Sequence, residues 1–162
     1  MSEMADAAMA DDEKPGALRL RQRHVLCAVG FEPVEGIRAF GHGDAMISNM
    51  ARIVREQLRA PGGEAVMVTI ADSADSFCAP CAYRVGRDCR MQGRALRIDA
   101  AHGETLGIAP GDRMAWGALL GRVRDRVAAD DLDIICEGCP WLPFDVCKRG
   151  VLRLRDRPAA SV

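Results

Sequence analysis

Apolar residues recur at helical spacing in two long stretches of the chain. The first begins at Asp44, a good N-cap, and ends at Pro61-Gly62-Gly63. We expect its buried face to comprise Met46, Ile47, Met50, Ile53, Val54 and Leu58. The second stretch predicts another helix packed on the core, with an apolar stripe of Trp116, Leu119, Leu120, Val123 and Val127.

Three shorter helices follow from weaker patterns. The apolar residues between His24 and Phe31 predict one or two helical turns that stop near Gly30. Asp99 is expected to cap a short helix that ends at Gly107. Acidic residues favour helix N-termini, so Asp130 and Asp131 are expected to begin a third helix, with one face formed by Leu132, Ile135 and Cys136.

Two segments read as strands. Ala65–Ile70 is rich in β-branched residues and predicts a buried strand, which could pair with a short strand at Ala17–Arg21. Together with the helices, these strands predict an α+β fold that is mainly helical. We expect one compact domain with a small two-stranded sheet and two cysteine-rich metal loops.

The chain of 162 residues fits one domain, which we place at residues 17–154. Residues 1–16 are expected to form a disordered acidic tail, because they carry five acids against Lys14 and so a net charge of −4. Residues 155–162 are expected to be a frayed C-terminal tail.

Charge and hydropathy exclude several classes of function. The net charge of −1 provides no global field for nucleic acid or for a membrane surface. No signal-peptide pattern and no membrane-spanning run is present, so we expect a cytoplasmic protein. Thiols stay reduced in the cytoplasm, and the odd count of seven cysteines also disfavours a disulfide framework.

The cysteines form two triplets with identical spacing. Phe77–Arg90 reads F-C-x-x-C-x-Y-x5-C-R, and Ile135–Lys148 reads I-C-x-x-C-x-W-x5-C-K. Two thiolates at C-x-x-C spacing suit one metal ion or one cluster, and a third cysteine can join them from a following turn. The duplication therefore predicts two metal sites, with ligands Cys78, Cys81, Cys89 and Cys136, Cys139, Cys147.

Each triplet supplies three ligands of an expected four. His24 and Cys27 are three residues apart on a predicted helix, so they share a face. Together with the triplets they make eight ligands, enough for two four-ligand sites. Alternatively, Cys27 completes one site and the other keeps an open position, with His24 buried in the core or donating a hydrogen bond to sulfur. His42 and His102 are expected to be solvated histidines, and the arginines around the first triplet a solvated face.

A pair, a single cysteine and a distant fourth ligand is a pattern more typical of iron–sulfur clusters than of zinc ribbons. We therefore expect one or two 4Fe–4S clusters and a role in electron transfer to an unidentified redox or protein partner. A zinc-stapled interaction module is the alternative. A second alternative is an enzyme with an open iron site, although no catalytic constellation is recognisable outside the cysteines.

The chain resembles a bacterial and archaeal family catalogued as domain of unknown function 1284. The resemblance rests on the R-x-x-H-x-x-C opening that ends at His24 and Cys27, on Asn49-Met50, on both triplets, and on Pro110-Gly111-Asp112 before Trp116. It covers most of Ala17–Leu154. The family is thought to bind iron–sulfur clusters, and this resemblance implies the same role for the seven cysteines and His24.

Overall fold

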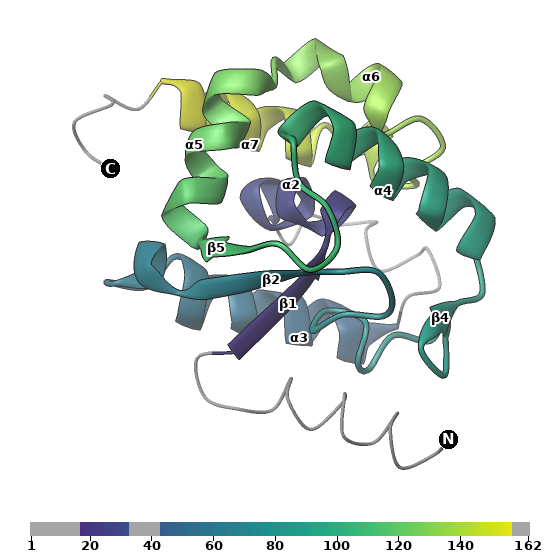
Figure 1. Cartoon of the computed structure of the whole chain (residues 1–162). Coiled ribbons are helices and arrows are strands. Elements are labelled where there is room, and N and C mark those ends of the chain that lie inside the picture. Colours follow the sequence, from purple (N-terminus) through teal and green to yellow (C-terminus); the bar gives the residue numbers. More distant parts are fainter. Residues whose placement is uncertain (1–16, 33–42, 157–162) are drawn as a thin grey trace.

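The computed structural model describes residues 17–32 and 43–156. A three-stranded sheet lies in the lower half of the molecule as drawn in Figure 1. In it, β1 (Ala17–Arg21) pairs in parallel with β2 (Met67–Ala71), with Leu20 opposite Ile70. This confirms the predicted pairing of the two segments. A third strand that was not predicted, β5 (Arg113–Ala115), adds antiparallel to β2.

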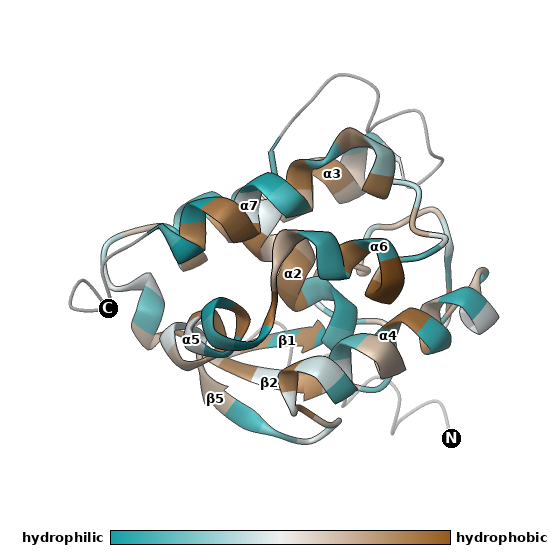
Figure 2. Cartoon of the chain, turned by 90° about the horizontal axis from the view of Figure 1, so that it is seen from above, coloured by the Kyte–Doolittle hydropathy of each residue, from teal (hydrophilic) through white to brown (hydrophobic). Residues whose placement is uncertain are grey.

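Helices supply most of the structure, so the α+β, mainly helical class is confirmed. Helix α2 (Gln22–Gly30) lies in the middle of α4 (Gln92–Leu106), α5 (Trp116–Arg126) and α7 (Val146–Arg155), and it packs against all three (Figure 2). In Figure 1 these helices lie above the sheet, and α3 (Asp44–Ile53) lies lower, behind the strands. Helix α3 continues as a π-helix over Val54–Leu58.

The predicted buried faces are confirmed on the two long helices. Every apolar residue assigned to the face of α3 and its extension is buried, as are Trp116, Leu119, Val123 and Val127 on the stripe of α5. Leu120 is half-buried. The short helix α6 (Leu132–Ile135) follows a 3-10 turn at Ala129–Asp131, which places the two aspartates at its start as expected.

Asp99 does not cap a helix. Helix α4 begins at Gln92, so Asp99 lies in its middle, where it is buried. Its Oδ2 accepts a hydrogen bond of 2.7 Å from Nε of Arg21, at the end of β1. The acid that looked like a start signal instead forms a buried ion pair between strand and helix. The predicted end at Gly107 is confirmed, since this residue is left-handed with φ 67°.

Helix α7 was not predicted, and Arg155, assigned to the C-terminal tail, is its last residue. The predicted tails at 1–16 and 157–162 lie outside the described residues. Among the residues described, no helix is long and apolar enough to cross a membrane.

Two glycines let α2 and α7 cross with their backbones in contact. A Cβ added to Gly30 would lie 2.4 Å from Cα of Cys147, and one added to Gly150 would lie 2.5 Å from Cα of Gly30. Any side chain at either position would overlap the other helix. This close crossing sets Cys147 against the helix that carries Cys27.

Candidate metal centre

The two C-x-x-C loops share one backbone turn. In each loop the N–H of the second cysteine donates to the carbonyl of the first, at 2.9 Å from Cys81 to Cys78 and at 2.9 Å from Cys139 to Cys136. Three residues later another amide donates to the carbonyl of the second cysteine, at 3.1 Å in both loops. The repeat in the sequence is therefore also a repeat in structure.

Backbone N–H groups also point at the sulfur atoms. The amide of Tyr83 donates to Sγ of Cys81 at 3.4 Å, and the amide of Met91 donates to Sγ of Cys89 at 3.4 Å. In the second loop the backbone N–H of Trp141 donates a hydrogen bond to the sulfur of Cys139. Hydrogen bonds of this kind would offset the negative charge of a metal-bound sulfur.

The third cysteines differ in their local structure. Cys89 lies in β4 (Asp88–Cys89), a strand of a small hairpin, opposite Arg84 of β3 (Arg84–Val85). Cys147 lies in the first turn of α7, after Asp145, which has a positive φ of 58°. Cys89 of the first triplet therefore comes from a hairpin, and Cys147 of the second triplet comes from the start of a helix.

Cys27 joins the second triplet. Together with Cys136, Cys139 and Cys147 it lines one small cavity, which we call the four-cysteine site. A hydrogen bond with Cys147, and then burial, raise the pKa of the Cys27 thiol. Burial is also the main cause that raises the pKa of Cys136 and of Cys139. These thiols are neutral at pH 7 unless a cation replaces their protons.

His102 was expected to be solvated, and this expectation is wrong. Its side chain is buried on α4, with Nε2 at 3.1 Å from Sγ of Cys136. Burial lowers its pKa to about 3, so the ring is neutral. The sequence carried a signal: His102 lies four residues after Ile98, on the apolar face of a helix that begins earlier than expected. His42 lies outside the described residues.

The first triplet lines a second pocket, which we call the three-cysteine site. Cys78, Cys81 and Cys89 share this pocket with His24. Cys27 and Cys139 of the four-cysteine site also border the pocket, so the two sites adjoin. Burial raises the pKa of Cys78 and of Cys81.

Asp75 organises this site, although the sequence analysis did not select it. One carboxylate oxygen lies 2.5 Å from Nδ1 of His24 and accepts the amide of Arg21 at 2.6 Å. The other accepts the amides of Phe77 and Cys78 at 3.0 and 3.1 Å. An acid that bonds amides two and three residues onward is a recognisable turn signal, and Asp75 stands three residues before Cys78.

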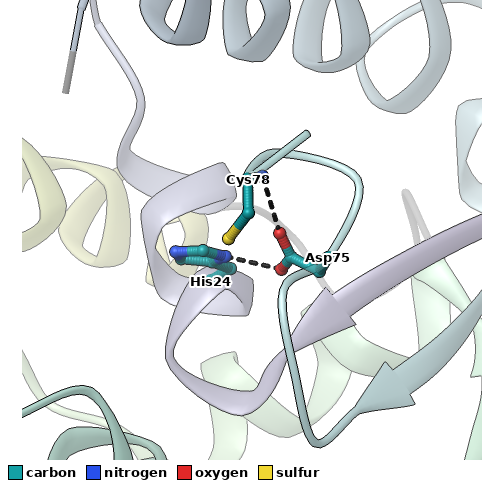
Figure 3. Close-up of side chains that lie close together, drawn as sticks. All are labelled: His24, Asp75 and Cys78. Carbon is teal, nitrogen blue, oxygen red and sulfur yellow. Dashed lines mark hydrogen bonds and ion pairs between the residues drawn. The ribbon is translucent and has the colours of Figure 1, made fainter. Parts of the chain in front are cut away.

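The partners of Asp75 stabilise its ionised form. Burial alone would raise the pKa, but the charge and hydrogen bond of His24 and the amide of Arg21 hold the pKa of Asp75 at about 2. Figure 3 shows the Cys78 sulfur turned toward the His24 ring. Ligand atoms of His24, Asp75 and Cys78 all lie within 4.8 Å of one another, so they could contact one cation.

The arginines around the first triplet do not form a uniform solvated face. Arg84 and Arg94 line the pocket of the three-cysteine site, together with Arg23 from α2. Arg87 and Arg90 are exposed. The cations that line this pocket thus come from β3, α4 and α2.

Comparison with known proteins gives the family. The family described as protein of unknown function (DUF1284) matches residues 41–147, a range that contains both triplets and stops short of His24 and Cys27 on the N-terminal side. No curated protein and no solved structure matches the chain. Because the match spans well over half of the sequence, the chain belongs to the DUF1284 family.

Proposed function

We propose that the protein binds metal at two adjoining centres of the iron–sulfur type and transfers electrons. The observation that carries this proposal is the four-cysteine site. Cys27 comes from α2 and meets the C-x-x-C pair and Cys147 in one cavity. A compact pair, a third cysteine and a distant fourth is a ligand pattern of iron–sulfur proteins. All seven cysteines are free thiols, as a reducing compartment such as the cytoplasm requires.

For the second centre we propose Cys78, Cys81 and Cys89 as ligands, with His24 as the fourth. Asp75 holds Nδ1 of His24, which leaves Nε2 for a metal. Asp75 itself suits an orienting role better than a ligand role, because its oxygens already accept three backbone amides. A carboxylate that orients a histidine ligand in this way is common around protein metals.

The surrounding donors support an anionic sulfur-rich centre. Nε of Arg23 and Nε of Arg94 are buried without a hydrogen-bond partner within the described residues, and both side chains line the three-cysteine pocket. Buried N–H groups need acceptors. Thiolates and cluster sulfides are acceptors of the required charge, and the bound group would supply reversible one-electron chemistry.

Structural zinc is the alternative, because four cysteines, or three cysteines and one histidine, also make a closed tetrahedral site. A three-cysteine centre with an open iron position is a further alternative if His24 keeps only its bond to Asp75. The arginine N–H groups would be satisfied by either kind of centre. Iron–sulfur is favoured by the ligand pattern of a compact pair, a third cysteine and a distant fourth.

Purification without oxygen, followed by iron, zinc and acid-labile sulfide analysis with electron paramagnetic resonance, tests the proposal. We expect a brown protein with iron and sulfide in equal amounts and a paramagnetic signal after reduction. A colourless protein that contains stoichiometric zinc and no sulfide would refute the cluster and support the zinc alternative.

A further inference from the structure

Arg23 lies between the two cysteine sites. It precedes His24 on α2 and stands four residues before Cys27, so Arg23 and Cys27 lie on the same face of the helix. Its side chain lines both the three-cysteine pocket and the four-cysteine cavity. Only 18% of that side chain is exposed. One partly buried cation therefore borders both sets of sulfur atoms.

Asp99 pairs with the Arg23 side chain only at 3.8 Å, so the positive charge of Arg23 can also act on the nearby sulfur atoms. Nε of Arg23 is 3.8 Å from a carboxylate oxygen of Asp99, and the other oxygen of Asp99 is bonded to Arg21. That Nε makes no hydrogen bond within the described residues.

Metal binding makes both sites anionic. A divalent ion bound by the four thiolates of the four-cysteine site forms a complex with a net charge of about −2. Three thiolates with a neutral histidine carry about −1 by the same count. Two adjoining negative centres repel each other, and a fixed cation between them offsets this repulsion.

We propose that Arg23 is a shared positioning charge that stabilises the bound metal at both sites, so that one side chain sets the affinity of two centres. This inference rests on the proposed two-site metal binding. The inference goes beyond metal binding because it assigns a role to a residue that is not a ligand. Loss of Arg23 should weaken both sites, whereas loss of a residue beside one site should weaken that site alone.

Cobalt(II) titration of single-site proteins tests the proposal, because the thiolate-to-cobalt absorption reports binding directly. Replacing Cys81 and Cys89 by serine leaves only the four-cysteine site, and replacing Cys136 and Cys147 leaves only the three-cysteine site. Each protein is then compared with and without R23Q. We expect R23Q to weaken cobalt binding about tenfold in both backgrounds, because it removes the cation that offsets the negative charge of each cobalt–thiolate complex.

Two matched variants separate charge from shape. R23K keeps the charge on a differently shaped side chain and is expected to weaken cobalt binding less than R23Q does in both backgrounds. H102Q removes the ring beside Cys136 and is expected to weaken only the four-cysteine site. If R23Q fails to fold by circular dichroism, R23M removes the charge while keeping the apolar stem.

The outcomes distinguish this inference from the proposed function. An R23Q effect confined to one background, or an equal loss in R23K and R23Q, overturns the shared role of Arg23. Absence of thiolate-to-cobalt absorption in the wild-type protein and in both single-site backgrounds overturns metal binding itself. Normal cobalt binding that R23Q and R23M leave unchanged overturns the inference about Arg23 alone.

Discussion

Cys147 touches the backbone of Gly30: a Cβ on Gly30 would lie 2.4 Å from the Cα of Cys147. This contact holds the start of α7 against α2, the helix that contributes Cys27. The position of Cys147, a candidate ligand, thus depends on the absence of a side chain at Gly30, which is not itself a candidate ligand.

The variant G30A is expected to push α7 away from α2. Overpacking of this kind costs about 1–3 kcal/mol of unfolding free energy, and we expect cobalt to bind more weakly at the four-cysteine site. Urea unfolding and cobalt titration measure the two effects. G93A is the matched control, because a Cβ at this helical glycine meets nothing within 4 Å. A G30A protein as stable as the wild type would contradict the close crossing.

The variant C27S is expected to remove one centre of two. Cys27 supplies the fourth sulfur of the four-cysteine site, so its loss should halve the metal bound per chain and leave the three-cysteine site filled. C89S should remove the other centre. Metal analysis after gel filtration measures both. Unchanged metal content in C27S would make Cys27 a core thiol that binds no metal.

The variant D75N is expected to weaken the three-cysteine site. The new amide cannot accept hydrogen bonds at the position that now accepts both the Arg21 amide and the His24 ring. Losing the partner of a buried donor costs about 1–3 kcal/mol, and loss of the group that orients a histidine ligand costs about 10–100-fold in metal affinity.

Cobalt titration in the protein that lacks Cys136 and Cys147 measures this effect of D75N. D72N is the control, since Asp72 is an exposed acid in the same loop. Equal affinity in D75N and D72N would remove His24 and Asp75 from the metal centre.

Glu32 predicts a small pH dependence of stability. It bonds Arg149 at 3.2 Å and Arg153 at 2.6 Å on α7. Burial opposes the shift, but these hydrogen bonds and charges hold the pKa of Glu32 below its usual value. A lowered native pKa stabilises the fold fully above the unfolded pKa of about 4.3, and this contribution disappears as pH falls through the native pKa.

The comparison of E32Q with the wild type by thermal unfolding from pH 3 to pH 7 tests this dependence. We expect E32Q to be less stable by under about 1 kcal/mol at pH 7, because the pair is partly exposed. The difference should vanish toward pH 3. A difference that grows on acidification would have the wrong sign for a stabilising carboxylate.

Local patterns in the sequence predicted the elements that follow one period. The α3 face, the α5 stripe and the pairing of Ala17–Arg21 with the second strand all repeat a simple spacing. Helix α4 was misplaced because Asp99 has the residue type of a cap while its role depends on Arg21, 78 residues away in the chain. No local pattern reveals such a partner.

In the candidate site, too, the sequence predicted the features that depend on local spacing and missed those that depend on distant contacts. Spacing alone identified the two triplets, because each depends on a local turn. The assignment of Cys27 to the second triplet depends on the crossing of α2 and α7, and therefore on Gly30 and Gly150, which no metal motif includes. Asp75 and His102 were missed for a similar reason, since each contacts a candidate ligand that another element supplies.

The order of the cysteines along the chain has a consequence for biosynthesis. A protein leaves the ribosome from its N-terminus at about 5–20 residues per second. His24 and the first triplet emerge early, so the three-cysteine site has its proposed ligands while α5 and α7 are still unmade. A centre at the four-cysteine site must wait for Cys147, so only the three-cysteine site has all its proposed ligands before synthesis reaches α7.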